Sequence, residues 1–375
     1  MVRKNTAVSS GHKYEQLYRE LKEQLFAMSP GSSFPSVREL MKSHGVSQAT
    51  VCKALADLEE EKLLSRNVGS GTFVTEEVLK YSPGARPVIG LSIPNWPGKS
   101  NALKQYHFYK LKDEYGFELL FLPFDYQKYR VIPVLPRTRI DLLIVSPSAD
   151  NLRNEDAALL ESFGIPFIVF GRDCNRLRLN CVWRDEEFIG MKVARELLEL
   201  GHRKLALVIT EPRISAVENR CKGFLQYCEL NGVTPQVIDC GIAPGENALP
   251  KVYRTITGLL RNGRPEATGF FFISEEPVLG AYKAFYEAGV KIPEEVSIIG
   301  CGNTGDSEFF HPGLTTVDDD MQQMVRSTYE AARKLLRNSE LINTGIRFEL
   351  VERGSTAPVP GSSFLMSNNK GNSKC

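Results

Sequence analysis

One stretch of the sequence carries side chains that could read the edges of DNA bases. In residues 46–64, VSQATVCKALADLEEEKLL, Val51, Leu55 and Leu58 fall on one face of a predicted helix. The opposite face carries short or slender side chains, namely Gln48, Ala49, Cys52, Lys53 and Ala56. Such a face can enter a DNA major groove, which is about 12 Å wide. Glutamine matches the two-point edge of adenine, lysine matches guanine or a phosphate, and an alanine methyl can contact a thymine methyl.

Two predicted helices precede this stretch and would position it. Apolar side chains recur at helical spacing over residues 14–25, and the Pro-Gly pair at 30–31 ends this first helix. Ser36 and Glu39 form a capping box, which satisfies two backbone amides at the start of a second helix. Gly45 can end the second helix in the left-handed conformation.

A cap and a hairpin complete the pattern. Ser47 is placed to cap the third helix. Residues 63–66 and 72–75 are predicted strands that enclose a glycine-rich turn. Gly69 and Gly71 in this turn would let the backbone approach sugar and phosphate closely. Helix, helix, tight turn, helix and hairpin is the order of a winged helix-turn-helix, which binds DNA.

Composition limits the remaining possibilities. The 375 residues are 42% hydrophobic and 24% charged, with a formal net charge of +1, which is typical of a soluble globular protein. Residues 1–80 contain eleven Lys and Arg against ten Asp and Glu, so net charge carries no DNA signal. The eight cysteines form no CxxC pair, which argues against zinc and disulfides and for a reducing cytoplasm. We find no export signal and no run of transmembrane length.

The remainder of the chain has a different texture. Residues 79–87, LKYSPGARP, are a predicted linker after a DNA-binding domain at 1–78. Strands and helices alternate over 88–358, which predicts parallel sheets in two doubly wound α/β lobes. We assign about 88–172 and 317–333 to the first lobe, 173–316 and 334–358 to the second, and 359–375 to a disordered tail.

The strand candidates locate a binding site. They are residues 88–93, 117–122, 141–145, 166–170, 204–209, 268–273 and 296–300, with predicted helices at 151–163, 186–200, 215–231, 246–262 and 276–289, whereas 106–136 look shortened and irregular. Ligands of open parallel sheets bind at the carboxyl ends of the strands. The candidate ligand loops are therefore 94–96, 171–172, 274–276 and 302–303.

The N-terminal pattern resembles the GntR family of winged-helix regulators. The resemblance rests on FPSVREL (34–40), VSQATVCKALADLEEEKLL (46–64) and GSGTFV (69–74). It implies DNA contacts at Ser36, Arg38, Ser47, Gln48, Thr50, Lys53, Ser70 and Gly71. Gln48 and Cys52 replace arginines that are common in the family, so we expect fewer guanine contacts and a weaker attraction to phosphate.

The C-terminal region resembles the sensor domain of LacI/GalR-type regulators and periplasmic sugar-binding proteins. LELGHRKLALV (198–208), ENRCKGF (218–224), LGAYKAFYEAGVKIPEEVSIIGCGN (279–303), HPGLTTV (311–317) and ELVERGST (349–356) carry the resemblance. Its combination with a GntR-type domain is similar to arabinose-repressor-like regulators. The resemblance implies a homodimer and an effector bound between the lobes, with Arg220 at the sugar-gripping position.

The candidate effector residues are Arg220, Arg172, Ser274, Glu275, Asn303, Trp96 and Trp183. A guanidinium can bind two vicinal hydroxyls, and an indole can stack on a sugar, although a lone aromatic is more often a core residue. Gly171, Ser274 and Gly302 stand where related proteins often carry an acid or an amide. Because Arg172 and Arg220 are still present as cations, we expect the effector to be a sugar or a sugar acid.

These observations predict a cytoplasmic, effector-controlled transcription repressor that uses no cofactor or metal. Two alternatives share its fold: a regulator whose cleft has lost its ligand, and a transport-type sugar-binding protein. An enzyme is disfavoured, because HExxH, GxSxG and phosphate-binding glycine motifs are absent and the five histidines form no cluster.

Overall fold

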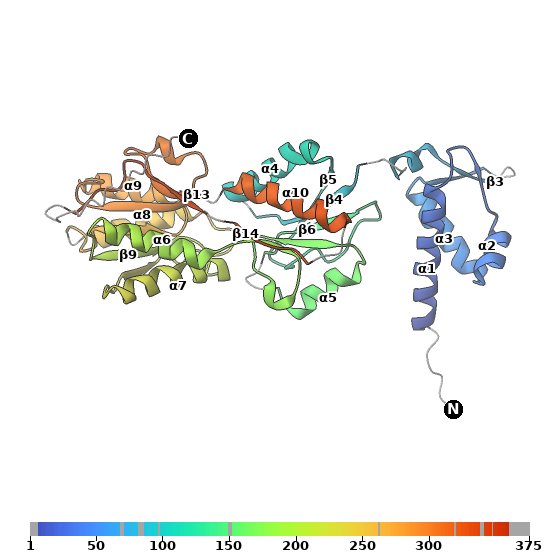
Figure 1. The fold of residues 1–375 in the computed structure, drawn as a ribbon, viewed down its shortest axis with the longest axis horizontal. Coiled ribbons are helices and arrows are strands. Elements are labelled where there is room, and N and C mark those ends of the chain that lie inside the picture. The colour runs from blue at the N-terminus through green and yellow to red at the C-terminus, as the bar shows by residue number, and fades with distance from the viewer. Residues whose placement is uncertain are drawn as a thin grey trace, which may run out of the picture. The chain divides into compact units, whose positions relative to one another are not determined.

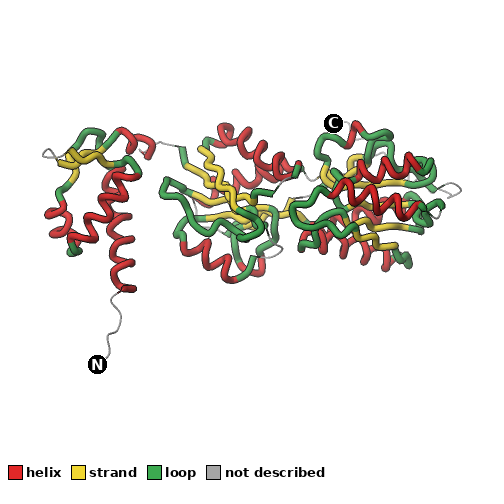
Figure 2. Tube along the Cα trace, turned by 180° about the vertical axis from the view of Figure 1, so that it is seen from behind, coloured by secondary structure: helices red, strands yellow, loops and turns green. Residues whose placement is uncertain are grey.

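The computed structural model describes residues 7–67, 71–81, 86–96, 98–148, 152–261, 263–318, 320–337, 341–346 and 348–359 (Figures 1 and 2). The chain divides into two compact units. The first comprises residues 1–88 together with the segment 134–140, and the second comprises residues 89–133 and 141–375.

The first unit is a winged helix-turn-helix, as predicted. Its elements are α1 Ala7–Phe26, β1 Ser33–Phe34, α2 Val37–His44, α3 Gln48–Glu60, β2 Leu64–Asn67, β3 Gly71–Val74 and the 3-10 helix η1 Glu76–Tyr81. Strand β3 lies between β1 and β2 and is antiparallel to both. The two-residue strand β1 was not predicted, because it is too short to show an alternating pattern.

The predicted helix caps are confirmed. The Ser36 hydroxyl accepts from the Glu39 amide at 3.4 Å, and the Glu39 carboxylate accepts from the Ser36 amide at 2.7 Å. Gly45 ends α2 with φ of 61°, and the Ser47 hydroxyl accepts from the Thr50 amide at 3.3 Å at the start of α3. These contacts fix the short turn between α2 and α3 with local bonds alone.

One apolar core orients α3 within the first unit. Leu21 and Leu25 of α1 pack with Val51, Leu55 and Leu58 of α3, and all five side chains are at most 1% exposed. Because this stripe is buried, the opposite side of α3 must face outward.

The second unit contains two lobes, each built on a six-stranded sheet. The first lobe has the strand order β14-β8-β7-β6-β4-β5 and the second β10-β9-β11-β12-β13-β15. The first-lobe elements are β4 Val88–Pro94, α4 Lys99–Tyr115, β5 Glu118–Phe124, β6 Leu142–Val145, α5 Asn154–Ser162, β7 Phe167–Phe170, η2 Asn175–Leu177, β8 Cys181–Arg184, α10 Met321–Arg337 and β14 Asn343–Ile346. The second-lobe elements are α6 Glu186–Glu199, β9 Leu205–Ile209, α7 Ser215–Leu230, β10 Gln236–Asp239, α8 Ala248–Leu260, β11 Gly269–Phe272, α9 Val278–Glu287, β12 Ser297–Gly302, η3 Ser307–Phe309, β13 Thr315–Asp318 and β15 Glu349–Val351.

Helices cover both faces of each sheet (Figure 1). In the second lobe, α8 and α9 lie on one face and α6 and α7 on the other. Strand β11 shows why: Phe270 and Phe272 pack in one core cluster, while Phe271 packs in the other. A strand buried on both faces is apolar throughout, which explains why the predicted parallel sheets were recognisable.

The predicted boundaries within this unit need correction. Strand β8 and strand β14 belong to the first-lobe sheet, although residues 173–184 and 334–346 were assigned to the second lobe. The chain passes between the lobes after β8, after β13 and after β14. Strands of only four residues carry too little pattern to reveal these crossings.

Two long first-lobe helices, α4 and α10, were also missed. Helix α4 lies partly within the segment predicted to be irregular. Its apolar face was not recognised, because only Phe108, Leu111 and Tyr115 are buried among many polar residues. Both helices pack against each other on one face of the sheet (Figure 1). The predicted linker overlaps η1 at its start, and residues 82–85 of that linker and 360–375 of the predicted tail lie outside the described residues.

A close helix crossing shapes the second lobe. A Cβ atom added to Gly190 of α6 would lie 2.0 Å from the Arg220 carbonyl oxygen of α7. One added to Gly223 of α7 would lie 1.9 Å from the Glu187 carbonyl oxygen of α6. Only glycine fits at these two positions, so α6 and α7 approach with their backbones in contact.

We expect Gly190→Ala to lower the free energy of unfolding of the second unit by at least about 2 kcal/mol, because the helices must separate. Gly258→Ala is the matched control, since an added Cβ on this exposed α8 residue meets nothing within 4 Å. The control should gain up to about 1 kcal/mol from helix propensity. Differential scanning calorimetry measures both changes, and equal transition temperatures for the two variants would contradict the close crossing.

Candidate functional site

A cavity of about 500 Å³ opens between the two lobes of the second unit. In the first lobe its walls come from the loops that follow β4, β6 and β7 and from the end of β8, and in the second lobe from the loops that follow β9, β10, β11 and β12. Additional side chains come from α4, α7, α10 and the start of α8. These are the carboxyl ends of parallel strands, where a ligand was expected. The volume lies in the range of small-molecule sites.

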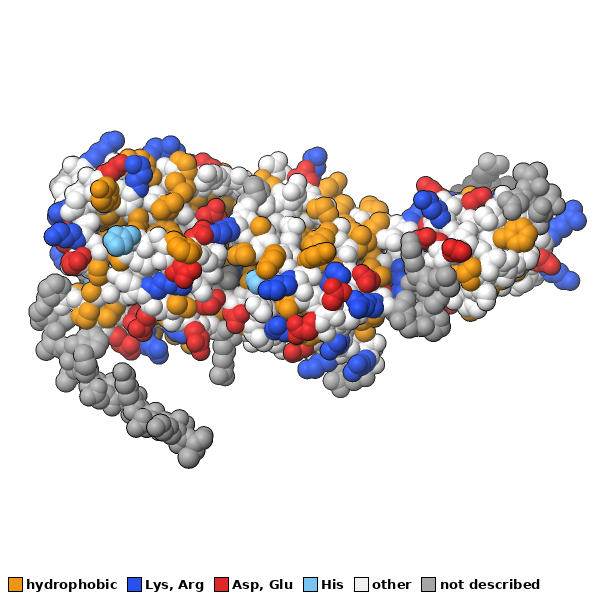
Figure 3. All heavy atoms as spheres, turned by 90° about the horizontal axis from the view of Figure 1, so that it is seen from above, with side chains coloured by type: hydrophobic (Ala, Val, Ile, Leu, Met, Phe, Trp, Pro, Cys, Tyr) orange, Lys and Arg blue, Asp and Glu red, His pale blue; other side chains and the backbone are white. Residues whose placement is uncertain are grey.

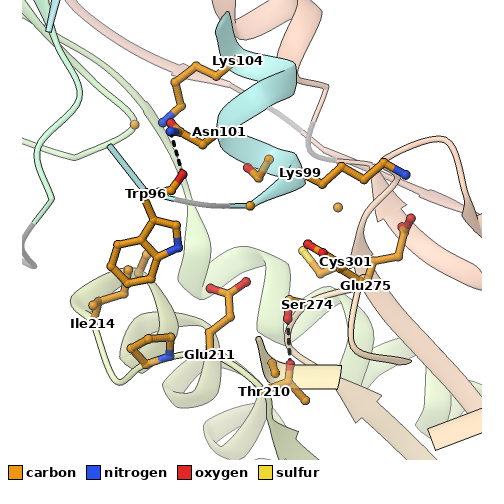
Figure 4. Close-up of a pocket in the computed structure, with 18 of the residues that line it drawn as sticks. Trp96, Lys99, Asn101, Lys104, Thr210, Glu211, Ile214, Ser274, Glu275 and Cys301 are labelled. Carbon is orange, nitrogen blue, oxygen red and sulfur yellow. Dashed lines mark hydrogen bonds between the residues drawn. The ribbon is translucent and has the colours of Figure 1, made fainter. Parts of the chain in front are cut away.

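Five of the seven candidate effector residues line this cavity. They are Trp96, Arg172, Arg220, Ser274 and Glu275. They come from four different loops or helices, and the two-lobed fold brings them together. Trp96 and the second-lobe residues Glu211 and Ile214 lie close to one another in Figure 4, so the indole faces the second lobe.

Trp183 and Asn303 are not among the described residues that line the cavity, and their side chains are bonded within the fold. The Trp183 indole donates to the Asn343 side chain at 2.6 Å, which joins β8 to β14. Asn303 donates to Asp318 at 3.0 Å and accepts from Arg353 at 2.8 Å. The prediction for these two residues is therefore not supported. The position of a residue along the chain does not reveal hydrogen-bond partners of this kind.

Arg220 is held in a buried ion cluster. It is 5% exposed, and its Nε and Nη2 donate to the same oxygen of Glu186 at 3.0 and 2.6 Å. Its Nη1 donates to the Ile273 carbonyl. Arg184 lies on the other oxygen of Glu186 at 3.0 Å. We call Arg184, Glu186 and Arg220 the arginine–glutamate cluster.

The cluster changes what Arg220 can offer a ligand. Burial alone would raise the pKa of Glu186, but the charges of Arg184 and Arg220 outweigh it and hold the pKa below its ordinary value. Glu186 is therefore ionised at neutral pH and offsets part of the arginine charge. A guanidinium has five N–H donors, and three hydrogen bonds are made inside the protein, so Arg220 keeps donors for hydroxyl oxygens.

Ser274 and Glu275 have internal partners at the cavity wall. The Ser274 hydroxyl lies 2.8 Å from that of Thr210 (Figure 4). Glu275 is 2% exposed and accepts from the Thr304 amide at 3.0 Å and the Thr316 hydroxyl at 3.0 Å. Glu275 thus anchors the loop after β12, where Gly302 leaves space for the cavity.

The structure adds cavity residues that sequence reasoning missed. Lys99, Asn101 and Lys104 come from α4, and Glu211 and Glu246 come from second-lobe loops. Asn101 donates to the carbonyls of Pro94 and Trp96 and so fixes the loop that carries the indole (Figure 4). Glu211 directly follows a predicted strand and Thr210, so the rule applied to other loops could have found it.

The first unit presents the predicted DNA-binding face. Ser36, Arg38, Ser47, Gln48, Lys53 and Gly71 are exposed and Thr50 is half-buried, whereas Ser70 lies outside the described residues. The Lys53 ammonium lies 4.3 Å from the centre of the Tyr14 ring, so α1 directs this side chain. Gly71 has φ of 111°, a conformation that favours glycine, at the start of the second hairpin strand.

Other kinds of site find little support among the described residues. No group of three or more His, Cys, Asp or Glu side chains there could hold a metal ion. The described helices include none that is long and apolar enough to cross a membrane.

Comparison with known proteins assigns both units. Residues 13–74 match the family described as bacterial regulatory proteins, gntR family, and residues 194–356 match a periplasmic binding protein-like domain. The arabinose metabolism transcriptional repressor of Halalkalibacterium halodurans is 25% identical over 351 residues, 86% of this chain and 90% of that protein. The repressor of the same name from Geobacillus stearothermophilus is 23% identical, over 92% of this chain and 98% of that protein.

A solved structure agrees with this assignment. A LacI family transcriptional regulator from Enterococcus faecium with bound ribose has a TM-score of 0.60 and 25% identity, and the match covers 72% of this chain and 99% of that one. The fold and sites therefore define a transcription regulator. In this chain a GntR-type winged helix is joined to a LacI-like, periplasmic-binding-protein-like sensor domain.

We expect Glu186→Gln to lower the free energy of unfolding by about 3–5 kcal/mol, because the buried Arg220 and the partly buried Arg184 lose their counter-charge. The folded pKa of Glu186 is depressed, so its contribution is fully present above the ordinary value of 4.5 and is lost as pH falls through the folded pKa. The difference from wild type should therefore shrink in acid. Denaturant titrations at several pH values measure it.

Glu187→Gln is the matched control, since Glu187 pairs with the half-exposed Lys222 one position along the same helix. This control should change stability by less than about 1 kcal/mol. A Glu186 variant as stable as the control would show that the arginine–glutamate cluster contributes nothing.

Proposed function

We propose that this protein is a transcription repressor whose affinity for operator DNA is controlled by a sugar or sugar derivative bound in the cavity. The observation that carries the proposal is the presence in one chain of an outward-facing recognition helix and a ligand-sized cavity between two lobes. A transport protein or an enzyme would not need an outward-facing recognition helix.

The DNA-binding proposal rests on α3 and the wing. Helix α3 buries one stripe and leaves Gln48, Ala49, Lys53 and Ala56 exposed, which are side chains that can reach base edges. Residues 1–80 contain eleven Lys and Arg against ten Asp and Glu, so their net charge would attract DNA little. On the face shown in Figure 3, acidic and basic side chains are interspersed. Specific contacts by α3 must then supply more of the affinity.

We propose that the protein acts as a cytoplasmic homodimer on a palindromic operator. A winged helix reads only a few base pairs, and a second copy one helical turn away, or a multiple of it, supplies the rest of the affinity. In the sensor, Leu279 and Tyr286 of α9 are 53% and 85% exposed, which suits a face covered by a second copy.

The effector proposal rests on the cavity and on relatives. Carboxylate acceptors, guanidinium donors and the Trp96 indole together suit a sugar, whose ring has polar edges and an apolar face. The names of two relatives refer to arabinose metabolism, and ribose is bound in a related structure. We therefore expect a ligand of pentose size.

We expect Gln48→Ala to reduce discrimination at one adenine of the operator by about 1–3 kcal/mol, because the two-point contact is lost. The operator would be isolated from random duplexes by selection with the wild-type protein, and binding to single-base variants would be measured by fluorescence anisotropy. Gln24→Ala, the same change at an exposed position of α1, should leave every affinity unchanged. Unaltered base preference in the Gln48 variant would remove this residue from the interface.

We expect Glu211→Gln to weaken effector binding about tenfold, because a hydrogen bond to a charged acceptor is replaced by a neutral one. Glu218→Gln, on the exposed side of α7 beside Arg213, is the matched control and should bind normally. Isothermal titration calorimetry with arabinose, ribose and their derivatives measures both. Failure of the wild type to bind any of these ligands would favour a regulator whose cleft no longer binds an effector.

Arg220 is a poor choice for the same test. Its removal would leave Glu186 buried with one of its two arginines missing, so loss of binding could reflect loss of structure. A loss of ligand response in an Arg220→Ala variant would then say little about contact with the ligand.

A further inference from the structure

One short segment of the sensor half of the chain packs with the DNA-binding unit. Residues 134–140 lie between β5 and β6 of the first lobe along the chain, yet they belong to the first compact unit together with residues 1–88. Arg137 of this segment donates through Nη1 to Asp57 Oδ1 at 2.7 Å, and the same nitrogen lies 3.3 Å from a carboxylate oxygen of Glu60. Both acceptors belong to α3, so a sensor segment is bonded to the helix that would read DNA.

Asp57 is a buried carboxylate with two hydrogen-bond donors. It accepts from the Tyr14 hydroxyl of α1 as well as from Arg137. Burial would raise the pKa of Asp57, but the bonds from Tyr14 and Arg137 outweigh it and hold the pKa below its ordinary value. Asp57 is therefore ionised at neutral pH. Arg137 is the cation that pairs with it, and removal of one partner from a buried ion pair leaves a costly charge behind.

Lys53 is the DNA-binding candidate that this pair affects. It lies four positions before Asp57 on α3, so the two side chains share one side of the helix. Its charge acts on Asp57, while its exposed ammonium lies 4.3 Å from the centre of the Tyr14 ring. Without Arg137, the Asp57 carboxylate would attract Lys53 into an ion pair along the helix. A lysine held in that pair would be less able to reach a DNA phosphate or base.

The segment that carries Arg137 is connected to the cavity on both sides. Before it, the carbonyl oxygen of Tyr129 accepts from the Ser148 hydroxyl at 2.7 Å, and that of Arg130 accepts from the Ser148 amide at 3.0 Å. Ser148 lines the cavity. After the segment, the chain enters β6, which leads into the loop that contains Ser148. The same stretch of chain therefore contributes to the cavity wall and to the surroundings of α3.

We propose that Arg137 is a positioning residue for DNA binding: it neutralises Asp57, which leaves Lys53 available to DNA, and it makes operator affinity depend on a sensor segment. This inference rests on the proposed function, because it assumes that α3 binds DNA. It goes beyond that function by naming the sensor residue that acts on the recognition helix.

Arg137→Gln in the full-length protein tests the inference against an operator selected with the wild-type protein. We expect the affinity for this operator, measured by fluorescence anisotropy, to fall about tenfold, because one charge-assisted contact made by Lys53 is lost. Arg137→Lys keeps a positive charge near Asp57 and should retain most of the affinity. Arg176→Gln, at an exposed arginine of the first lobe outside the cavity, is the matched control and should bind like wild type.

Two double-mutant cycles distinguish a positioning role from direct contact between Arg137 and DNA. If Arg137 acts through Lys53, Arg137→Gln should add no further loss of affinity to a Lys53→Ala variant. If it acts through the charge of Asp57, it should also add no loss to an Asp57→Asn variant, since a neutral amide does not attract Lys53. The Arg137 side chain is 55% exposed, so thermal unfolding should show that the first unit stays folded without it.

The outcomes separate this inference from the function on which it rests. An Arg137→Gln variant that binds the operator as tightly as wild type, or additive losses in either cycle, would overturn the inference and leave the DNA-binding function standing. A first unit that unfolds in this variant would assign Arg137 a structural role and overturn the inference as well. A wild-type protein that selects no operator would overturn both.

Discussion

Arg220 can reach the cavity from α7 because α6 lies near enough for Glu186 to hold its guanidinium. That proximity depends on Gly190 and Gly223, which let the two helix backbones touch. A buried carboxylate between two arginines is stable only when all three remain in place, since each isolated charge would carry a large desolvation cost. The position of Arg220 at the cavity thus depends on the close packing of α6 and α7 in the second lobe.

The same cluster connects the lobes. Arg184 ends β8 of the first lobe, and Glu186 begins α6 of the second, so one of the chain crossings lies within the cluster itself. Asp185 between them caps α6 by accepting from the Phe188 amide at 3.0 Å. A ligand that contacted Arg220 would therefore touch a group bonded to one of the chain crossings between the lobes.

The winged helix is organised by shorter-range forces. Its caps, left-handed turn and apolar stripes act over a few residues, and its core is a single cluster of buried side chains. The recognition face consists of the α3 side chains that lie outside that core. Substitutions on this exposed face should therefore cost little stability, whereas substitutions in the sensor cavity act on bonded networks.

The sequence by itself determined the winged helix, the alternating α/β character of the rest and most of the loops that form the cavity. Helical periodicity, capping residues and buried apolar strands are local patterns, and each can be recognised in a single sequence. Arg172, Ser274, Glu275 and Trp96 were found in this way, because strand ends can be counted along the chain, whereas Arg220 was implied by the resemblance to sugar-binding sensor domains.

Only the tertiary structure decided which partners those side chains have. The pairing of Arg220 with Glu186 and the bonding of Trp183 to Asn343 each join residues at least 34 positions apart. The four-residue strands β8 and β14, which set the lobe boundary, likewise carry no pattern of their own. Charge balance and strand pairing are properties of groups that folding brings together. The sequence therefore shows the cationic side chains of the cavity, but not the carboxylates that pair with them.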